Sequence, residues 1–197
     1  MDAKLIMKEN CRKRFAPVVK EIERLLAEAN APVMVAIDGN AASGKTTLGF
    51  YLKEIFECNL FHMDDFFLRD EQRTEERLTE VGGNVDYERF KQEVMEPLLK
   101  GEAVIYRPFS CKTRTIQEAV EIPFSRLNII EGSYSQHPYL GEVYQLKVFM
   151  EIPEETQLER IRQRNGDEML KRFVSEWIPK ENAYFEKFDI REKSMVI

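Results

Sequence analysis

The sequence predicts an α/β protein in which helices cover both faces of a parallel sheet. Two observations lead to this fold class. Short, almost entirely apolar segments alternate with helical segments along the chain, and this order is typical of parallel sheets. The segments 33–37, 127–130 and 146–152 are apolar almost throughout, as expected of strands that are buried on both faces. Ligands of such sheets bind at the carboxyl ends of the strands, so the residues that follow each strand are the first candidates for a site.

The composition is that of one globular domain, and we expect residues 1–197 to form it. The net charge of −6 argues against broad nucleic-acid binding, which normally requires a basic face. No apolar run is long enough to span a bilayer, and the first 14 residues lack the apolar region of a signal peptide. We therefore expect a cytoplasmic protein without a nucleic-acid or membrane partner.

The remaining elements follow from apolar spacing and turn residues. Residues 3–29 are expected to form an amphipathic helix that Pro17 bends or breaks, and residues 1–30 are thus an N-terminal helical extension. Residues 68–86 are expected to be a surface loop. Further helices are expected at 46–56, 87–99, 154–164 and 168–188, and further strands at 59–63, 104–106, 119–122 and 194–197.

A phosphate-binding loop directly follows the apolar segment 33–37. Residues 39–46 read GNAASGKT and match G-x-x-x-x-G-K-[ST] at every fixed position. Glycines let such a backbone curl so that its N–H groups and the start of the next helix face phosphate oxygens. We expect Lys45 to reach the β- and γ-phosphates of a nucleoside triphosphate, and Thr46 to bind Mg²⁺. The predicted nucleotide-binding residues are Gly39, Asn40, Ala41, Ala42, Ser43, Gly44, Lys45, Thr46 and Thr47.

Carboxylates follow two other predicted strands. Asp64 and Asp65 come after the strand at 59–63, and either could accept the proton of a hydroxyl that attacks a phosphoryl group. Adjacent residues of a strand point to opposite sides, so only one of the two is expected to face the site. Glu131 follows the apolar strand 127–130, which is the arrangement of a carboxylate that orders Mg²⁺.

Arginines cluster after the last long strand, in the predicted lid and following helix at 154–188. Arg160, Arg162 and Arg164 precede a predicted break at Asn165 and Gly166. A hinged segment with several arginines suits a lid that closes over a triphosphate and stabilises the charge on the transferring group. We expect Arg160 and Arg164 to act in catalysis and Arg162 to contact the nucleotide. The alternative is a solvent-exposed face that is paired with nearby glutamates.

Five segments together resemble the uridine kinase and phosphoribulokinase family of P-loop kinases. They are residues 38–48 (DGNAASGKTTL), 62–69 (HMDDFFLR), 83–90 (GNVDYERF), 106–114 (YRPFSCKTR) and 130–135 (IEGSYS), in the family's order. The resemblance covers about residues 33–190 and implies a P-loop fold with a five-stranded parallel sheet in three layers. It also implies ATP and Mg²⁺ as cofactors and phosphoryl transfer to a hydroxyl of uridine, cytidine or a related nucleoside.

The resemblance also implies roles for single residues. Asp64 aligns with the base of the family, Asp86 with a contact to the ribose hydroxyls, and Glu131 with a residue near Mg²⁺. Two neighbours, Asp65 and Tyr87, are assigned to the acceptor site with them.

One segment departs from the family's pattern. Arg107 and Lys112 stand where uridine kinases carry the Tyr and His that read the pyrimidine, whereas Phe109 and Arg114 are retained. We assign all four to the acceptor site. Their charge leaves other acceptors open, such as pantothenate, a nicotinamide-type riboside or a sugar phosphate. A regulator that hydrolyses ATP slowly is the alternative outside the kinases. Whether the protein forms a homo-oligomer also stays open.

Overall fold

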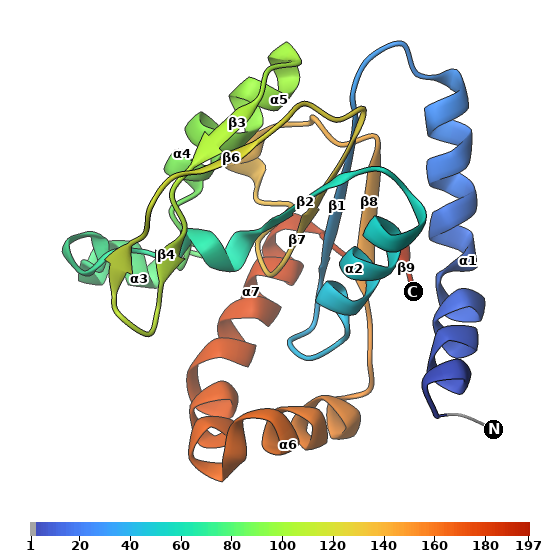
Figure 1. The fold of residues 1–197 in the computed structure, drawn as a ribbon. Helices are drawn as coiled ribbons and strands as arrows, with labels where there is room; N and C mark the ends of the chain where they lie inside the picture. The colour runs from blue at the N-terminus through green and yellow to red at the C-terminus, as the bar shows by residue number, and fades with distance from the viewer. Residues whose placement is uncertain (1–2) are drawn as a thin grey trace.

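The structure is a computed structural model that describes the backbone from residue 3 and the side chains from residue 9. Its centre is a five-stranded sheet in the order β2-β7-β1-β8-β9, in which all neighbours are parallel (Figure 1). The strands are β1 (Val33–Gly39), β2 (Asn59–His62), β7 (Leu127–Glu131), β8 (Leu146–Met150) and β9 (Met195–Val196). The predicted fold class and the five-stranded parallel sheet are thus confirmed.

Helices cover both faces of the sheet and make three layers. The helices α1 (Ala3–Glu28) and α2 (Lys45–Ile55) pack on one face, together with Val33, Val35 and Ile37 of β1. Met34 points to the opposite face, where a second apolar core contains residues of α7 (Ile178–Phe188) and of the helix over residues 87–100. Successive side chains of a strand point to opposite faces, so a strand buried on both sides must be apolar throughout.

The N-terminal helix corrects one expectation. Helix α1 runs through Pro17 as one helix, without the break that we considered. Proline removes one helical hydrogen bond, that to the carbonyl oxygen of Lys13. Pro17 and Lys13 both lie on the exposed side of α1, where water can replace this bond. Phe15 and Val18, on the other side, are buried and hold the helix against the sheet.

The segment between β2 and β7 also differs from the expected loop and helix. Residues 68–86 contain a short helix, α3 (Glu75–Thr79), because the hydroxyl of Thr74 accepts a hydrogen bond from the N–H of Arg77 at 3.1 Å and caps it. The helix over residues 87–100 has three parts: α4 (Tyr87–Phe90), a π-helical turn (Lys91–Met95) and α5 (Glu96–Lys100). Two small antiparallel pairs follow. β3 (Val104–Tyr106) pairs with β6 (Val120–Ile122), and β4 (Phe109–Ser110) with β5 (Thr115–Ile116).

The C-terminal third folds back over the end of the sheet. Helix α6 (Glu154–Arg172) continues through a π-helical turn (Phe173–Trp177) into α7. Gly166 has φ 80° and ψ 169° inside α6, so the helix kinks where the sequence predicted a break. In Figure 1 α6 lies beyond the lower end of the sheet, under the loop between β1 and α2, and α7 rises from it along one face of the sheet. None of the described helices combines the length and the apolar composition needed to cross a lipid bilayer.

Candidate active site

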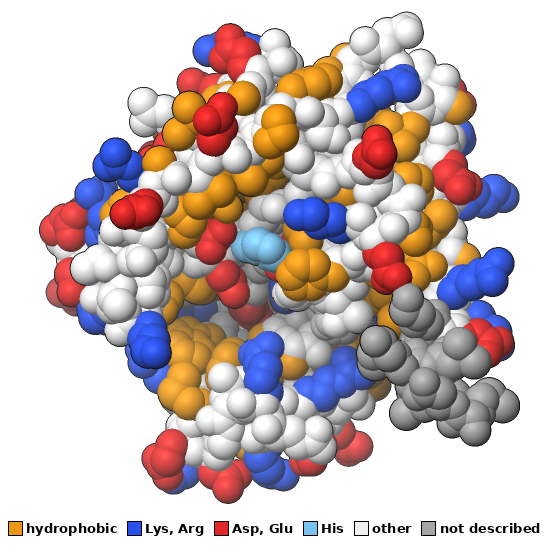
Figure 2. Space-filling model, in the orientation of Figure 1, with side chains coloured by type: hydrophobic (Ala, Val, Ile, Leu, Met, Phe, Trp, Pro, Cys, Tyr) orange, Lys and Arg blue, Asp and Glu red, His pale blue; other side chains and the backbone are white. Residues whose placement is uncertain are grey.

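A cavity of about 1170 Å³ opens at the carboxyl ends of the strands. It is larger than the ~300–1,000 Å³ typical of a small-molecule site, which leaves room for two ligands side by side. The P-loop, the turn after β2, the end of β7, helices α6 and α7, and the first half of α1 all contribute to its lining. Figure 2 shows this face hollowed, with acidic side chains in the hollow and Lys and Arg side chains along its lower rim.

The P-loop forms one wall of the cavity. Helix α2 begins at Lys45, directly after Gly44, which has a left-handed φ of 104°. The Lys45 ammonium group donates to the carbonyl oxygens of Gly39 at 2.7 Å and Asn40 at 3.0 Å, so it is held over the loop. Gly39 approaches β8 so closely that a Cβ there would lie 2.3 Å from the carbonyl oxygen of Met150. The loop therefore presents backbone N–H groups, a helix N-terminus and an ammonium group to an anion.

Asp38 ties the start of the P-loop to α7. Its carboxylate is fully buried and accepts from the N–H of Gly39 at 2.8 Å, the hydroxyl of Tyr184 at 2.9 Å and the N–H of Gln136 at 3.3 Å. Burial raises the pKa of Asp38 to about 6, although the positive charge of Lys45 opposes the shift. The Asp38 carboxylate thus lies behind the phosphate site, and the ammonium group of Lys45 in front of it balances the negative charge.

This buried carboxyl predicts a pH-dependent stability. The folded protein binds the Asp38 proton more tightly than the unfolded chain does, so the stabilisation is present below pH 4 and is lost as pH rises through about 6. The expected loss is about 3 kcal/mol, at 1.36 kcal/mol per pKa unit. We expect urea unfolding to show that the stability of the wild type relative to Asp38→Asn falls by this amount between pH 4 and pH 7. A difference that is independent of pH would contradict the assignment.

Thr46 and Glu131 meet at the end of β7 and β1. The hydroxyl of Thr46 donates to the Glu131 carboxylate at 3.0 Å, and the imidazole of His62 lies 2.5 Å from the same oxygen. This contact with Glu131 raises the pKa of His62. A hydroxyl and a carboxylate are oxygen ligands that fit Mg²⁺, which in phosphoryl-transfer sites takes few protein ligands and completes its shell with phosphate and water. Among the described residues there is no cluster of three or more His, Cys, Asp or Glu side chains that could hold a metal ion.

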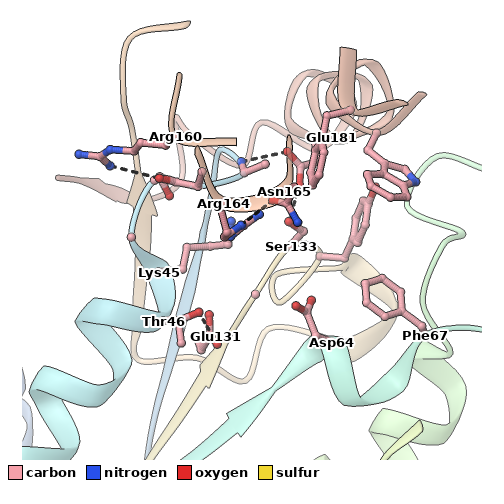
Figure 3. A pocket seen from close by; sticks show the side chains of 18 of the residues that line it. Lys45, Thr46, Asp64, Phe67, Glu131, Ser133, Arg160, Arg164, Asn165 and Glu181 are labelled. Carbon is pink, nitrogen blue, oxygen red and sulfur yellow. Dashed lines mark hydrogen bonds between the residues drawn. The ribbon is translucent and has the colours of Figure 1, made fainter. Parts of the chain in front are cut away.

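Asp64 lies in the same cavity as the P-loop. Figure 3 shows its carboxylate facing the space in front of Lys45, Thr46 and Glu131. The protein around it excludes much of the bulk water although its surface remains open to the cavity. This desolvation raises the pKa of Asp64, the negative charge of Glu131 adds to the rise, and Lys45 opposes it. Asp65 does not line the cavity, and its carboxylate instead accepts from the Tyr106 hydroxyl at 3.1 Å.

The three lid arginines have different surroundings. Arg160 lines the cavity and donates to the carbonyl oxygen of Ala42 in the P-loop at 3.1 Å. Arg164 also lines the cavity, and Figure 3 shows it next to Lys45. Arg162 does not line it, because its guanidinium pairs with Glu159 and Asp167 on the exposed side of α6. The structure therefore brings Arg160 and Arg164 to the P-loop, and Arg162 agrees with the alternative of a paired solvent face.

Of the predicted acceptor residues, the structure brings Phe109 and Arg114 to the cavity. The Arg114 guanidinium pairs with Asp70 at the rim, with Nε 3.0 Å from the carboxylate. Arg107 and Lys112 are exposed and do not line the cavity. Tyr87 lies in the core, where its ring stacks on His137 at 4.2 Å between centroids.

Asp86 is buried and serves as the N-cap of α4. Its carboxylate accepts from the N–H of Arg89 at 3.1 Å and from the amide of Gln72 at 2.8 Å. Its carboxylate oxygens are occupied in this way, and Asp86 is not among the residues that line the cavity. A capping Asp before a helix follows an ordinary local rule, which gives the residue a structural reason of its own.

Sequence reasoning missed a carboxylate that reaches the P-loop. Glu181 of α7 accepts from the N–H of Ala41 at 3.1 Å and from the hydroxyl of Ser133 at 2.5 Å. No motif marks it, because it stands in an otherwise ordinary amphipathic helix. It also missed a group of aromatic side chains in the lining of the cavity: Phe67, Tyr134, Phe173 and Trp177. Their spacing along the chain carries no signal, since they come from three separate segments.

Comparisons with known proteins agree with this architecture. No protein-family model and no curated protein matches the sequence. Among solved structures, a "possible uridine kinase" from Bacillus stearothermophilus is 18% identical with a TM-score of 0.68, over 92% of this chain and 99% of that one. A "putative fructose transport system kinase" from Silicibacter sp. TM1040 is 24% identical with a TM-score of 0.70, over 92% and 95%.

A third similar structure is D-glycerate 3-kinase from Cryptococcus neoformans var. grubii. It is 14% identical with a TM-score of 0.61, over 88% of this chain and 89% of that one. These three proteins carry names with different acceptors, so the similarity is one of architecture. Together with the parallel sheet and the P-loop between β1 and α2, it shows that this chain has the fold of the P-loop kinases.

Proposed function

We propose that the protein is an ATP-dependent kinase that transfers the γ-phosphoryl group to a hydroxyl of a small molecule. The observation that carries this proposal is the position of Asp64, which faces the same cavity as Lys45 and Glu131. A carboxylate in this position can accept the proton of a hydroxyl that attacks the γ-phosphate. The cavity volume of about 1170 Å³, which exceeds that of a single small-molecule site, supports the same function.

The residues of the cavity have separate roles in the proposed reaction. The P-loop N–H groups, Lys45 and the start of α2 hold the triphosphate. Thr46 and Glu131 hold Mg²⁺, which neutralises phosphate charge when it is bound. Asp64 accepts the proton of the acceptor hydroxyl as its oxygen bonds to the γ-phosphorus and the bond from that phosphorus to the bridging oxygen of ADP breaks. Arg164, beside Lys45, offsets negative charge on the transferring group. Arg160 holds the P-loop through Ala42.

For the acceptor, we propose a nucleoside such as uridine or cytidine. Aromatic side chains line the cavity beyond Asp64, among them Phe67, Phe109 and Trp177. Flat apolar faces of this kind stack on a base, whereas a sugar phosphate or pantothenate has no aromatic ring to stack on them. A nicotinamide-type riboside also carries a ring and is the second candidate on the same observation. We also propose that the protein works in the cytoplasm, where ATP is available.

An acceptor panel tests the proposal. The full chain is incubated with ATP and Mg²⁺ and one compound at a time: pyrimidine and purine nucleosides, a nicotinamide riboside, pantothenate and sugar phosphates. We expect ADP release to require an acceptor that contains an aromatic ring, and Phe67→Ala to raise the KM of that acceptor more than that of ATP. Turnover only with acceptors that lack an aromatic ring would overturn the nucleoside assignment and leave the kinase function standing.

A further inference from the structure

The order of the strands gives the bound triphosphate a direction. Asp64 follows β2 and Glu131 ends β7, and both strands lie on one side of β1. If the γ-phosphate meets Asp64 on this side, then the nucleoside half of the donor must extend to the other side of the P-loop. On that side lie β8 and β9, together with the start of α6.

The first half of α1 forms the cavity wall on that side. Asn10, Cys11, Arg14 and Phe15 line the same cavity as Thr47 and Arg160. The guanidinium of Arg14 reaches the carbonyl oxygens of Glu151 at 3.5 Å and Ile197 at 3.4 Å, just beyond the ends of β8 and β9. The helix is held there by Phe15, which is buried and packs against Tyr51 of α2 at 5.5 Å between ring centroids.

Among the described residues, the polar side chains of this wall have no carboxylate partner, and Arg14 contacts only backbone carbonyl oxygens. Asn10 is exposed, and its amide makes no hydrogen bond to another described residue. The positive charges of Arg14 and Arg160 repel each other. Neither arginine forms an ion pair with a carboxylate in the described part of the chain. Burial and the charge of Arg160 lower the pKa of Arg14. Such an arrangement favours a ligand with hydrogen-bonding edges and a π-face between the two arginines.

We propose that the N-terminal helix α1 completes the donor site and that Asn10 and Arg14 bind the nucleoside half of ATP. This inference rests on the proposed triphosphate site and adds a base and ribose subsite to it. The side-chain amide of Asn10 offers a hydrogen-bond donor and a hydrogen-bond acceptor to the edge of a base. The flat guanidinium of Arg14 offers further hydrogen-bond donors and a positive charge. The helix is thereby part of the enzyme's binding machinery and more than a cover for the sheet.

The test separates the nucleoside from the phosphates. Binding of Mg²⁺-ATP and of Mg²⁺-tripolyphosphate is measured by calorimetry for the wild type, Asn10→Ala and Arg14→Ala. Lys13→Ala is the matched control, since Lys13 lies on the same helix, is exposed and, within the described part of the chain, forms an ion pair only with Glu9. We expect each of the two variants to weaken ATP binding by about 5- to 10-fold, as for one lost hydrogen bond, and to leave tripolyphosphate binding within about 2-fold. The control should change neither.

Several outcomes decide the matter. Asn10→Ala removes no side-chain hydrogen bond between described residues. Equal weakening of both ligands in this variant would overturn the inference, as would ATP binding that is unchanged in both variants. The melting temperature of each variant shows whether Arg14→Ala destabilises the fold. If it does, the ATP and tripolyphosphate affinities of Asn10→Ala alone test the inference. A wild type that binds neither ATP nor tripolyphosphate would overturn the proposed triphosphate site and the inference with it. A failure of the triphosphate site is thus distinguished from a failure of the nucleoside subsite alone.

Discussion

Asp64→Asn is expected to lower acceptor phosphorylation by about 10²-fold or more while the Kd of ATP stays within a few-fold of the wild type. The amide keeps the shape of the side chain but cannot take the proton of the attacking hydroxyl. Lys45 is held by the carbonyl oxygens of Gly39 and Asn40, and no hydrogen bond between described residues joins Asp64 to the P-loop, so the triphosphate site should remain intact. The measurement is kcat with saturating acceptor, together with ATP binding by calorimetry.

Asp65→Asn is the matched control for this prediction. Its carboxylate accepts from Tyr106 outside the cavity, so its replacement should change kcat much less. The pH profile adds an independent readout. Asp64 must be deprotonated to act, and its raised pKa means that kcat should start to fall at a less acidic pH than for an ordinary aspartate. Normal turnover in Asp64→Asn, or equal losses in both variants, would show that Asp64 is not the base.

Lys45→Ala is expected to have the other large effect, a loss of about 10²- to 10³-fold in kcat/KM for ATP. Its ammonium group lies over the P-loop, bound to the carbonyl oxygens of Gly39 and Asn40, where phosphate oxygens would replace or join them. Without this charge, both the ground-state triphosphate and the transferring group lose stabilisation. Unlike Asp64→Asn, this variant should therefore also weaken ATP binding.

Lys53→Ala is the control for the lysine. Lys53 lies on the same helix α2, is exposed and does not line the cavity, so removing it changes the net charge equally without touching the site. Steady-state kinetics with varied ATP should separate the two variants by at least about 10²-fold in kcat/KM. If the two lysine variants behave alike, the P-loop does not hold the triphosphate as we describe.

Much of the fold could be predicted from the sequence because the central strands are buried on both faces and are therefore apolar almost throughout. Val33, Val35 and Ile37 pack toward α1 and α2, and Met34 toward the opposite core, so the pattern of a buried parallel strand was complete. The P-loop could be predicted equally well, since its tight turn, its lysine and the start of its helix must follow each other in the sequence. Asp64 and Glu131 followed from the rule that strand ends converge.

The rest of the site depends on contacts between distant segments. Glu181 reaches the N–H of Ala41, 140 positions earlier, and no local pattern announces such a contact. Conversely, Asp86 and Tyr87 stand in a segment that resembles a kinase motif, yet a helix cap and a ring stack on His137 hold them outside the cavity. A motif fixes residue types, whereas the packing around them decides which side chains face the ligand.

The central claim, phosphoryl transfer to an organic hydroxyl, is tested most directly by following the γ-phosphate of labelled ATP. With Mg²⁺ and the best acceptor of the panel, we expect the label to move to the acceptor in a one-to-one ratio with the ADP formed. Asp64→Asn should lower the rate of this transfer by about 10²-fold or more and leave ATP bound. Label that appears only as inorganic phosphate, at a rate that no acceptor changes, would contradict the account and favour a nucleotide-hydrolysing regulator.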